Sequence, residues 1–214
     1  KKANQGKFKR QIISFKNGIS ELPLAIARAL KAPIHTGVSL NRIQKDNIAW
    51  SVAWTQADGS EQSSQFDQVV LSLPAHKLDQ LPLPVEIKEA LSPFSEVEHP
   101  PVSVLSLGFK KTTIPHPLDG FGMLVPKCES RNILGALFPS SVFSGRAPEG
   151  HCLLSIFVGG VRQPELASDD TATVLKTVLP ELEALLGIKS APEFVHHKHW
   201  PKAIPQYTLG YAKY

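Results

Sequence analysis

Three histidines near the end of the chain come closest to the spacing of a metal site. His196, His197 and His199 fall within four positions, and on a strand the last two would share a face. Zinc needs three or four ligands, and only Glu193 lies close enough in the sequence to add one. Exposed histidines on an edge strand are therefore the preferred interpretation, and we predict no metal ion.

A glycine pattern beginning at Gly120 starts like the phosphate-binding loop of dinucleotide-binding folds. Val125 stands where the third glycine belongs, and no helix is expected to follow it. The sequence contains no other glycine-rich phosphate loop and no Gly-Lys-Ser/Thr loop. We therefore expect that this chain cannot hold a pyrophosphate in the usual way.

The sequence shows no set of residues suited to hydrolysis. A loop is expected to contain Ser140, Ser141 and Ser144. No histidine and carboxylate stand in a pattern that would indicate a Ser-His-Asp triad with any of them. Apart from Asp119, the core strands of the second half lack carboxylates, which disfavours acid–base catalysis. We predict no catalytic acid, base or nucleophile in this chain.

The remaining candidates are large apolar side chains on short strands between glycines. They form either an ordinary core or a broad cleft for a flat apolar ligand. Glycines in strands allow a close backbone approach, and pockets for cofactor-sized ligands are mostly apolar. The group comprises Phe121, Met123, Leu124, Leu137, Phe138, Phe143 and Phe157.

The second half of the chain supplies the strands that must position this group. In the strand expected over 152–158, alternate residues from Cys152 to Val158 share one face, while Leu153, Ser155 and Phe157 share the other. The longest helix is expected over 169–186, capped by Ser168, closed by Gly187 and kinked or split at Pro180. Further strands are predicted over 102–109, 121–126, 132–138 and 193–200.

The first half predicts a helix followed by a β-meander. The helix covers 18–31, with Ser20 as its cap and Pro23 in its first turn. Strands are expected over 34–40, 48–56, 61–66 and 69–73, the last buried on both faces, with a hairpin turn at Asp58-Gly59. A proline-rich joint with a short helix around 85–92 follows, and we predict a domain change near residue 83. The fold class is α/β (α+β), with a mixed sheet and flanking helices in the second half.

Composition excludes several other classes of protein. With 42% hydrophobic and 20% charged residues among 214, the chain is too apolar for disorder. It has no stretch near the roughly 18 apolar residues of a membrane span. Cys128 and Cys152 are expected to be reduced thiols. The positive charge gathers in the first ten residues, which we interpret as a solvated tail rather than a nucleic-acid contact.

Several motifs, in order, resemble those of the protoporphyrinogen oxidase family. The segment GFGMLVP at 120–126 is similar to the family's GFGxLVP. At the family's spacing follow LGALF, FSGRAP, FVGG and AIPQYTLG, at 134–138, 143–148, 157–160 and 203–210, and KNGISELP lies upstream at 16–23. Two departures are Ser144 in place of the commoner proline and Tyr211 where histidine is usual. The resemblance covers roughly residues 12–211.

This resemblance implies the flavin amine-oxidase-like fold, in which a substrate domain interrupts the FAD-binding domain. Residues 12–83 would then be a middle segment of the FAD-binding domain, and 84–207 would form most of the substrate-binding domain. Segments that complete the FAD site would lie outside this chain, which has no clear boundary signal at either end. We therefore expect a piece of a longer protein.

The resemblance assigns the substrate contacts to four apolar residues. Phe157 matches the aromatic residue that stacks on a pyrrole ring, and Leu124 with Leu137 matches the aliphatic pair on the opposite ring. Phe121 completes the set. On a straight strand Phe121 and Leu124 would point to opposite faces, so the segment must bend near Gly122 for both to line one pocket.

The implied activity is the FAD-dependent oxidation of protoporphyrinogen IX to protoporphyrin IX in haem biosynthesis. Three two-electron steps would deliver the electrons to FAD, and oxygen would reoxidise it to give hydrogen peroxide. Val38 matches the position whose backbone meets the adenine of FAD. The isolated chain is expected to be inactive because it lacks the pyrophosphate loop.

Several alternatives stay open from the sequence. The protein could be another flavin oxidoreductase of the amine-oxidase superfamily or a non-catalytic tetrapyrrole-binding module, and coproporphyrinogen III is an alternative substrate. We predict a cytoplasmic location. A homodimer and a peripheral association with a membrane are both left open.

Overall fold

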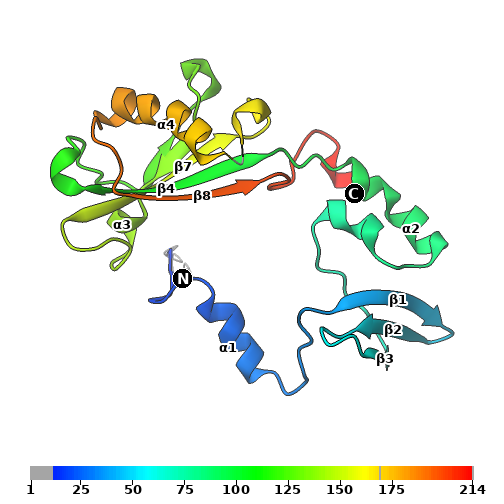
Figure 1. Ribbon diagram of the computed structural model, residues 1–214. Coiled ribbons are helices and arrows are strands. Elements are labelled where there is room, and N and C mark those ends of the chain that lie inside the picture. Colours follow the sequence, from blue (N-terminus) through cyan, green and yellow to red (C-terminus); the bar gives the residue numbers. More distant parts are fainter. Residues whose placement is uncertain (1–11, 169, 214) are drawn as a thin grey trace, which may run out of the picture. The chain divides into compact units, whose positions relative to one another are not determined.

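The computed structural model describes residues 12–168 and 170–213, so the basic residues of the N-terminal arm and Asp169 lie outside the described part. The chain forms two compact units that divide between Thr36 and Gly37 (Figure 1). The first contains α1 (Glu21–Ala29), which is shorter than predicted and has Pro23 in its first turn as expected. Ser20 occupies the N-cap position, but its side chain makes no capping hydrogen bond.

A three-stranded antiparallel meander opens the second unit. Its strands β1 (Ser39–Asp46), β2 (Ala49–Thr55) and β3 (Glu61–Phe66) lie side by side in chain order. The predicted hairpin is confirmed, and Asp58 accepts hydrogen bonds there from the N–H and hydroxyl of Ser60. The predicted strand over 34–40 is wrong, because pairing with β2 begins only at Ser39.

The apolar run 69–73 forms no strand, which corrects the prediction of a strand buried on both faces. Val70 is 85% exposed, whereas Leu71 packs against the small core around Ile43. The run therefore finds apolar partners on one side only, and no strand is there to pair with it. It leads through a short 3₁₀-helix to α2 (Val85–Leu91), close to the predicted helix.

The rest of the unit is built on a five-stranded sheet in the order β5-β6-β7-β4-β8. Every strand pair in it is antiparallel, so the prediction of a mixed sheet is wrong. The predicted α/β (α+β) class is confirmed. The strands are β4 (Val102–Lys110), β5 (Gly122–Leu124), β6 (Gly135–Leu137), β7 (His151–Gly159) and β8 (Phe194–Trp200). The helices are α3 (Pro139–Val142) and α4 (Thr171–Leu186). The 3₁₀-helices of the unit are Ala75–Gln80, Ser92–Glu96, Lys111–Thr113, Lys127–Glu129, Pro164–Leu166 and Tyr211–Lys213.

Helix α4 is capped by Asp170 and not by Ser168. The Asp170 carboxylate accepts hydrogen bonds from the N–H groups of Ala172 and Thr173, so it takes the role that favours aspartate at an N-cap. Gly187 ends the helix in the left-handed conformation, as predicted. Pro180 does not split the helix.

One face of the sheet is sealed by α4 (Figure 1). Strand alternation sends every second residue of β4 and β7 toward the helix, where it is buried. Packing against the sheet also explains why α4 continues through its proline, since Val178 and Leu182 on either side of Pro180 are fully buried. The central members of this core are Leu105, Leu107, Phe109, Leu154, Ile156, Val158, Val174, Val178 and Leu182.

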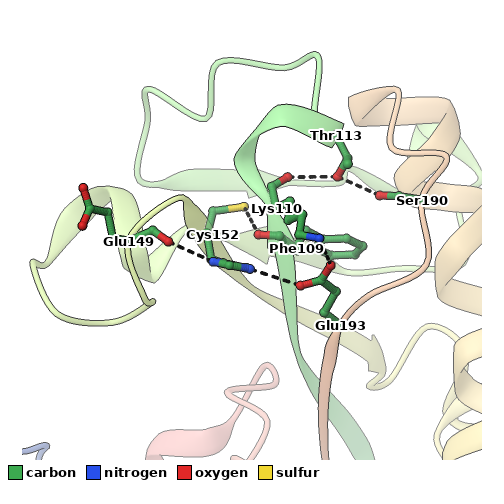
Figure 2. Close-up of polar contacts among 8 residues, drawn as sticks. Phe109, Lys110, Thr113, Glu149, Cys152, Ser190 and Glu193 are labelled. Atoms are coloured by element: carbon green, nitrogen blue, oxygen red, sulfur yellow. Dashed lines mark hydrogen bonds and ion pairs between the residues drawn. The ribbon is translucent and has the colours of Figure 1, made fainter.

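A polar cluster joins three strands at one end of the sheet (Figure 2). The Glu193 carboxylate lies 2.9 Å from Lys110 Nζ and 3.1 Å from His151 Nε2. Both contacts lower the pKa of Glu193, the hydrogen bond from Lys110 more strongly than that from His151. Close by, the buried Cys152 thiol donates to the carbonyl of Phe109, and desolvation raises the pKa of this thiol.

Candidate functional site

The face of the sheet turned away from α4 carries partly exposed side chains, and we call it the open face. In β7 it includes Leu153, Ser155 and Phe157, which alternate with fully buried neighbours. The register then extends the face across all five strands. The open face consists of Gly122, Leu124, Gly135, Leu137, His151, Leu153, Ser155, Phe157, Val102, Val104, Ser106, Gly108, Lys110, Phe194, His196, Lys198 and Trp200.

Three of the four predicted substrate contacts come together on the open face. Leu124 pairs with Gly135, and Gly135 pairs on its other side with Phe157. Leu124 and Phe157 thus flank a residue without a side chain, in one row across three strands. A Cβ at Gly135 would lie 2.5 Å from the carbonyl oxygen of Met123. Glycine is therefore required here for the strands to approach each other.

Leu137 lies on the same face, two pairs along the ladder. It pairs with Gly122 on one side and with Ser155 on the other. Gly122 has a φ of 151°, and a Cβ there would approach the carbonyl oxygen of Ala136 to 2.4 Å. Two glycines thus let the leucines lie over their neighbouring strands, which produces a smooth apolar surface.

Phe121 is the one predicted contact that the register does not place on the open face. Its carbonyl accepts a hydrogen bond of 3.0 Å from the N–H of Phe138, whose side chain is buried toward α4. Regular alternation would bury Phe121 beside it, yet Phe121 is 50% exposed. The φ of Gly122, 151°, marks an irregularity in the backbone between Phe121 and Leu124.

Val38 lies in the meander, one residue before the first ladder pair of β1. Its side chain is partly buried. Further along the same edge strand, the N–H of Ile43 donates to the carbonyl of Pro82, so chain covers that part of the edge. The backbone at Val38 therefore precedes the first ladder pair of β1.

Sequence analysis did not single out the contribution of β8 to the open face. Val104 pairs with Phe157 on one side and with Lys198 on the other, so all three share a row. The signal was present in the alternation of β8. If His197 and His199 share one face, Lys198 and Trp200 must share the other.

The two odd-numbered histidines of β8 serve a polar cluster on the α4 side. The fully buried Ser103 has its Oγ 3.0 Å from His197 Nε2 and 3.3 Å from His199 Nδ1. His197 also contacts Thr171 Oγ1 at 3.1 Å. Neither histidine is fully exposed, although β8 is an edge strand as predicted. Within residues 12–168 and 170–213, no three potential ligands group as a metal site would require.

The open face is suited to holding a large apolar molecule against the sheet. Its central row offers an aromatic ring, a glycine and a leucine, and it contains no carboxylate. Such a surface gains free energy by burying apolar area, while the aromatic ring adds a preferred stacking geometry. The arrangement is suited to binding and orienting a ligand, and the three residues of the central row carry no acid or base.

Comparison with known proteins places the chain in a family. The model of the family described as "Flavin containing amine oxidoreductase" matches residues 2–214. The chain belongs to the flavin-containing amine oxidoreductase family. Flavin is therefore the cofactor implied for the complete protein.

Two plant proteins are similar to this chain. Protoporphyrinogen oxidase 2, chloroplastic/mitochondrial, of Arabidopsis thaliana is 30% identical over 230 residues, which is 99% of this chain and 42% of the relative. The mitochondrial protoporphyrinogen oxidase of Nicotiana tabacum is 36% identical over 169 residues, 76% of this chain and 33% of the relative. The chain thus spans less than half the length of these relatives.

Solved structures show a similar fold. The crystal structure of a protein from Exiguobacterium sp. 255-15 aligns with a TM-score of 0.71 at 20% identity, over 94% of this chain and 42% of the solved chain. Reduced UDP-galactopyranose mutase aligns with a TM-score of 0.69 at 17% identity, over 92% and 41%.

Val38, the predicted contact to FAD, lies immediately before the edge strand β1. In the described part of the chain, no helix has the length and apolar character needed to cross a membrane.

Proposed function

We propose that this chain is the substrate-binding part of an FAD-dependent protoporphyrinogen oxidase. The observation that carries the proposal is the row of Leu124, Gly135 and Phe157, with Leu137 beside it, on one face of a sheet. The family match and the plant relatives support it. As part of this proposal, residues 12–83 belong to the FAD-binding domain and 84–207 to the substrate-binding domain.

The reaction proposed removes six hydrogens from protoporphyrinogen IX, in three two-electron steps, to give protoporphyrin IX. FAD, held in part by the backbone at Val38, accepts these electrons when bound, and oxygen is the final acceptor, which yields hydrogen peroxide. The residues of this chain act by position. They bury the apolar macrocycle, fix its plane through Phe157 and exclude water from one side of it.

Phe121 belongs to the same proposal in a different way. It precedes Gly122 at the edge of the sheet and is half exposed. We propose that it covers the rim of the bound macrocycle rather than the plane on which the macrocycle rests.

Assay of the complete protein tests this function directly. The protein encoded by the whole gene, loaded with FAD, is expected to convert protoporphyrinogen IX into fluorescent protoporphyrin IX with consumption of three oxygen molecules per product. A parallel assay with coproporphyrinogen III determines the preferred substrate, since a relative in Bacillus subtilis at 22% identity is named coproporphyrinogen III oxidase. Lack of turnover with either porphyrinogen would refute the proposal.

The location and assembly of the protein belong to the same proposal. The cytoplasmic location, a homodimer and a peripheral membrane association stay predictions, and the names of the plant relatives place those proteins in chloroplasts or mitochondria. Fractionation of the source cells with an antibody against this chain would determine the compartment.

A further inference from the structure

A cationic side chain lies among the apolar residues of the open face. Lys198 on β8 pairs with Val104, which pairs in turn with Phe157. Neighbouring strands are about 4.8 Å apart, so the backbone at Lys198 lies about 10 Å from the backbone at Phe157, two strands away. The row therefore passes from leucine through the aromatic ring to an ammonium group at the edge of the sheet.

Three contacts fix Lys198 on this face. Its neighbours His197 and His199 both reach the Ser103 hydroxyl on the opposite side of the sheet. Lys198 Nζ itself lies 5.0 Å from the ring centroid of Trp200, two residues along the same strand. A cation over the face of a tryptophan is held by the ring's negative face, which limits the freedom of the long side chain.

The charge of Lys198 is not balanced on the open face. The ladder residues of this face include no aspartate or glutamate, and Glu193, which precedes β8, is paired with Lys110 and His151. Within residues 12–168 and 170–213 Lys198 forms no salt bridge. The contrast is Lys110, whose ammonium group is paired with Glu193 at the end of the sheet. Lys198 is thus available to an anionic group brought by a ligand.

We propose that Lys198 binds a carboxylate of the substrate and so determines which acidic tetrapyrroles the enzyme accepts. This inference rests on the proposed function. Protoporphyrinogen IX combines an apolar ring system with two propionate side chains on its periphery, which matches an apolar row that ends in a cation. An ammonium–carboxylate hydrogen bond is charge-assisted and selects for the ionised side chain.

The test uses the complete protein with protoporphyrinogen IX and with its dimethyl ester, which lacks both negative charges. Lys198→Met is expected to raise the KM for the acid about tenfold and to leave the KM for the ester nearly unchanged, so that the preference for the acid disappears. Lys198→Arg should restore most of it, because the positive charge is retained. The value of kcat is expected to change little in both variants, since the contact lies away from the reacting ring carbons.

The control is Lys176→Met, which removes an exposed lysine from α4 on the opposite side of the sheet. It should leave both KM values as they are. An unchanged KM for the acid in Lys198→Met, or an equal rise for acid and ester, would overturn the inference. If the wild-type protein oxidises neither substrate, the proposed function fails before Lys198 is tested.

Discussion

Phe157 shows how one residue of a buried strand becomes available to a ligand. Its neighbours Ile156 and Val158 are fully buried against α4, whereas alternation turns the Phe157 ring to the open face. Its partner across the ladder is Gly135, which contributes no side chain to cover the ring. A ligand that covers such a ring gains about 25 cal/mol for each Å² of apolar area removed from water.

The substitution Phe157→Ala is therefore expected to weaken binding of protoporphyrin IX to the complete protein about tenfold or more. Burying an aromatic side chain of this size contributes about 1.5–3 kcal/mol, and most of that contribution is lost with the ring. Fluorescence titration of the wild-type and variant proteins measures the two dissociation constants.

A suitable control is Phe66→Ala, which removes a partly exposed phenylalanine from β3 in the meander. It should leave porphyrin affinity unchanged. Equal dissociation constants for the wild type and Phe157→Ala would show that the ring does not contact the macrocycle.

The sequence predicted the orientation of Phe157 but not that of Phe121. In β7 the alternation of apolar residues continues over nine positions, so a single register error would expose the whole core. The strand at Leu124 has only three residues, and the φ of Gly122 interrupts its alternation. A local pattern cannot resolve so short an element.

At the scale of elements, predictions succeeded where the signal was contained within the element. Strand β2 and helix α2 fall close to their expected ranges. The failures at 34–40 and 69–73 depended on partners elsewhere in the chain, since an apolar run forms a strand only where another strand can pair with it. The cap of α4 differs for a local reason, because aspartate and serine are both favoured at an N-cap and Asp170 lies two positions after the predicted Ser168.

The cluster at the end of the sheet gives a pH-dependent stability. Lys110 and His151 lower the pKa of Glu193 in the folded state. The stabilisation is therefore complete above the ordinary glutamate pKa of about 4.3 and is lost as the pH falls through the lowered folded value. We expect Glu193→Gln to lower the melting temperature of the complete protein modestly at neutral pH, with a difference that shrinks and disappears in acid.

Thermal unfolding at a series of pH values measures this dependence. Glu61→Gln is the matched control, since Glu61 is an exposed glutamate of β3 outside the cluster. If the melting temperatures of the wild type and Glu193→Gln differ by the same amount from neutral to acid pH, the linkage is contradicted. High salt should reduce the difference, because both partners of Glu193 are partly exposed.

At the scale of the whole molecule, the order of motifs predicted the family but not the arrangement of the sheet. The strands β4 and β8 are neighbours although most of the second half of the chain lies between them in the sequence. Strand β7 pairs with the other edge of β4. Pairing over such separations leaves no local trace in one sequence. Lys198 and Phe157 lie on the same face of the sheet because of that pairing, so their proximity could not be predicted from the sequence alone.

Our last prediction is that the isolated 214-residue chain folds without retaining FAD. A pyrophosphate is commonly held at the N-terminus of a helix by free N–H groups. The three longer helices of the described part, α1, α2 and α4, each carry a carboxylate at that end, from Glu21, Glu86 and Asp170. At Asp170 the hydrogen bonds from Thr173 lower the pKa of the carboxyl, which keeps it charged and repels phosphate.

The measurement is the visible absorbance of flavin after the chain is mixed with FAD and passed through a gel-filtration column. We expect circular dichroism typical of a folded α/β protein, no flavin band in the protein peak and no oxidation of protoporphyrinogen IX. Recovery of one FAD per chain would contradict the prediction, because it would require a pyrophosphate site that these acidic helix ends do not provide. The same column run with the complete protein should recover FAD, and this contrast would assign the binding of the dinucleotide to the remainder of the enzyme.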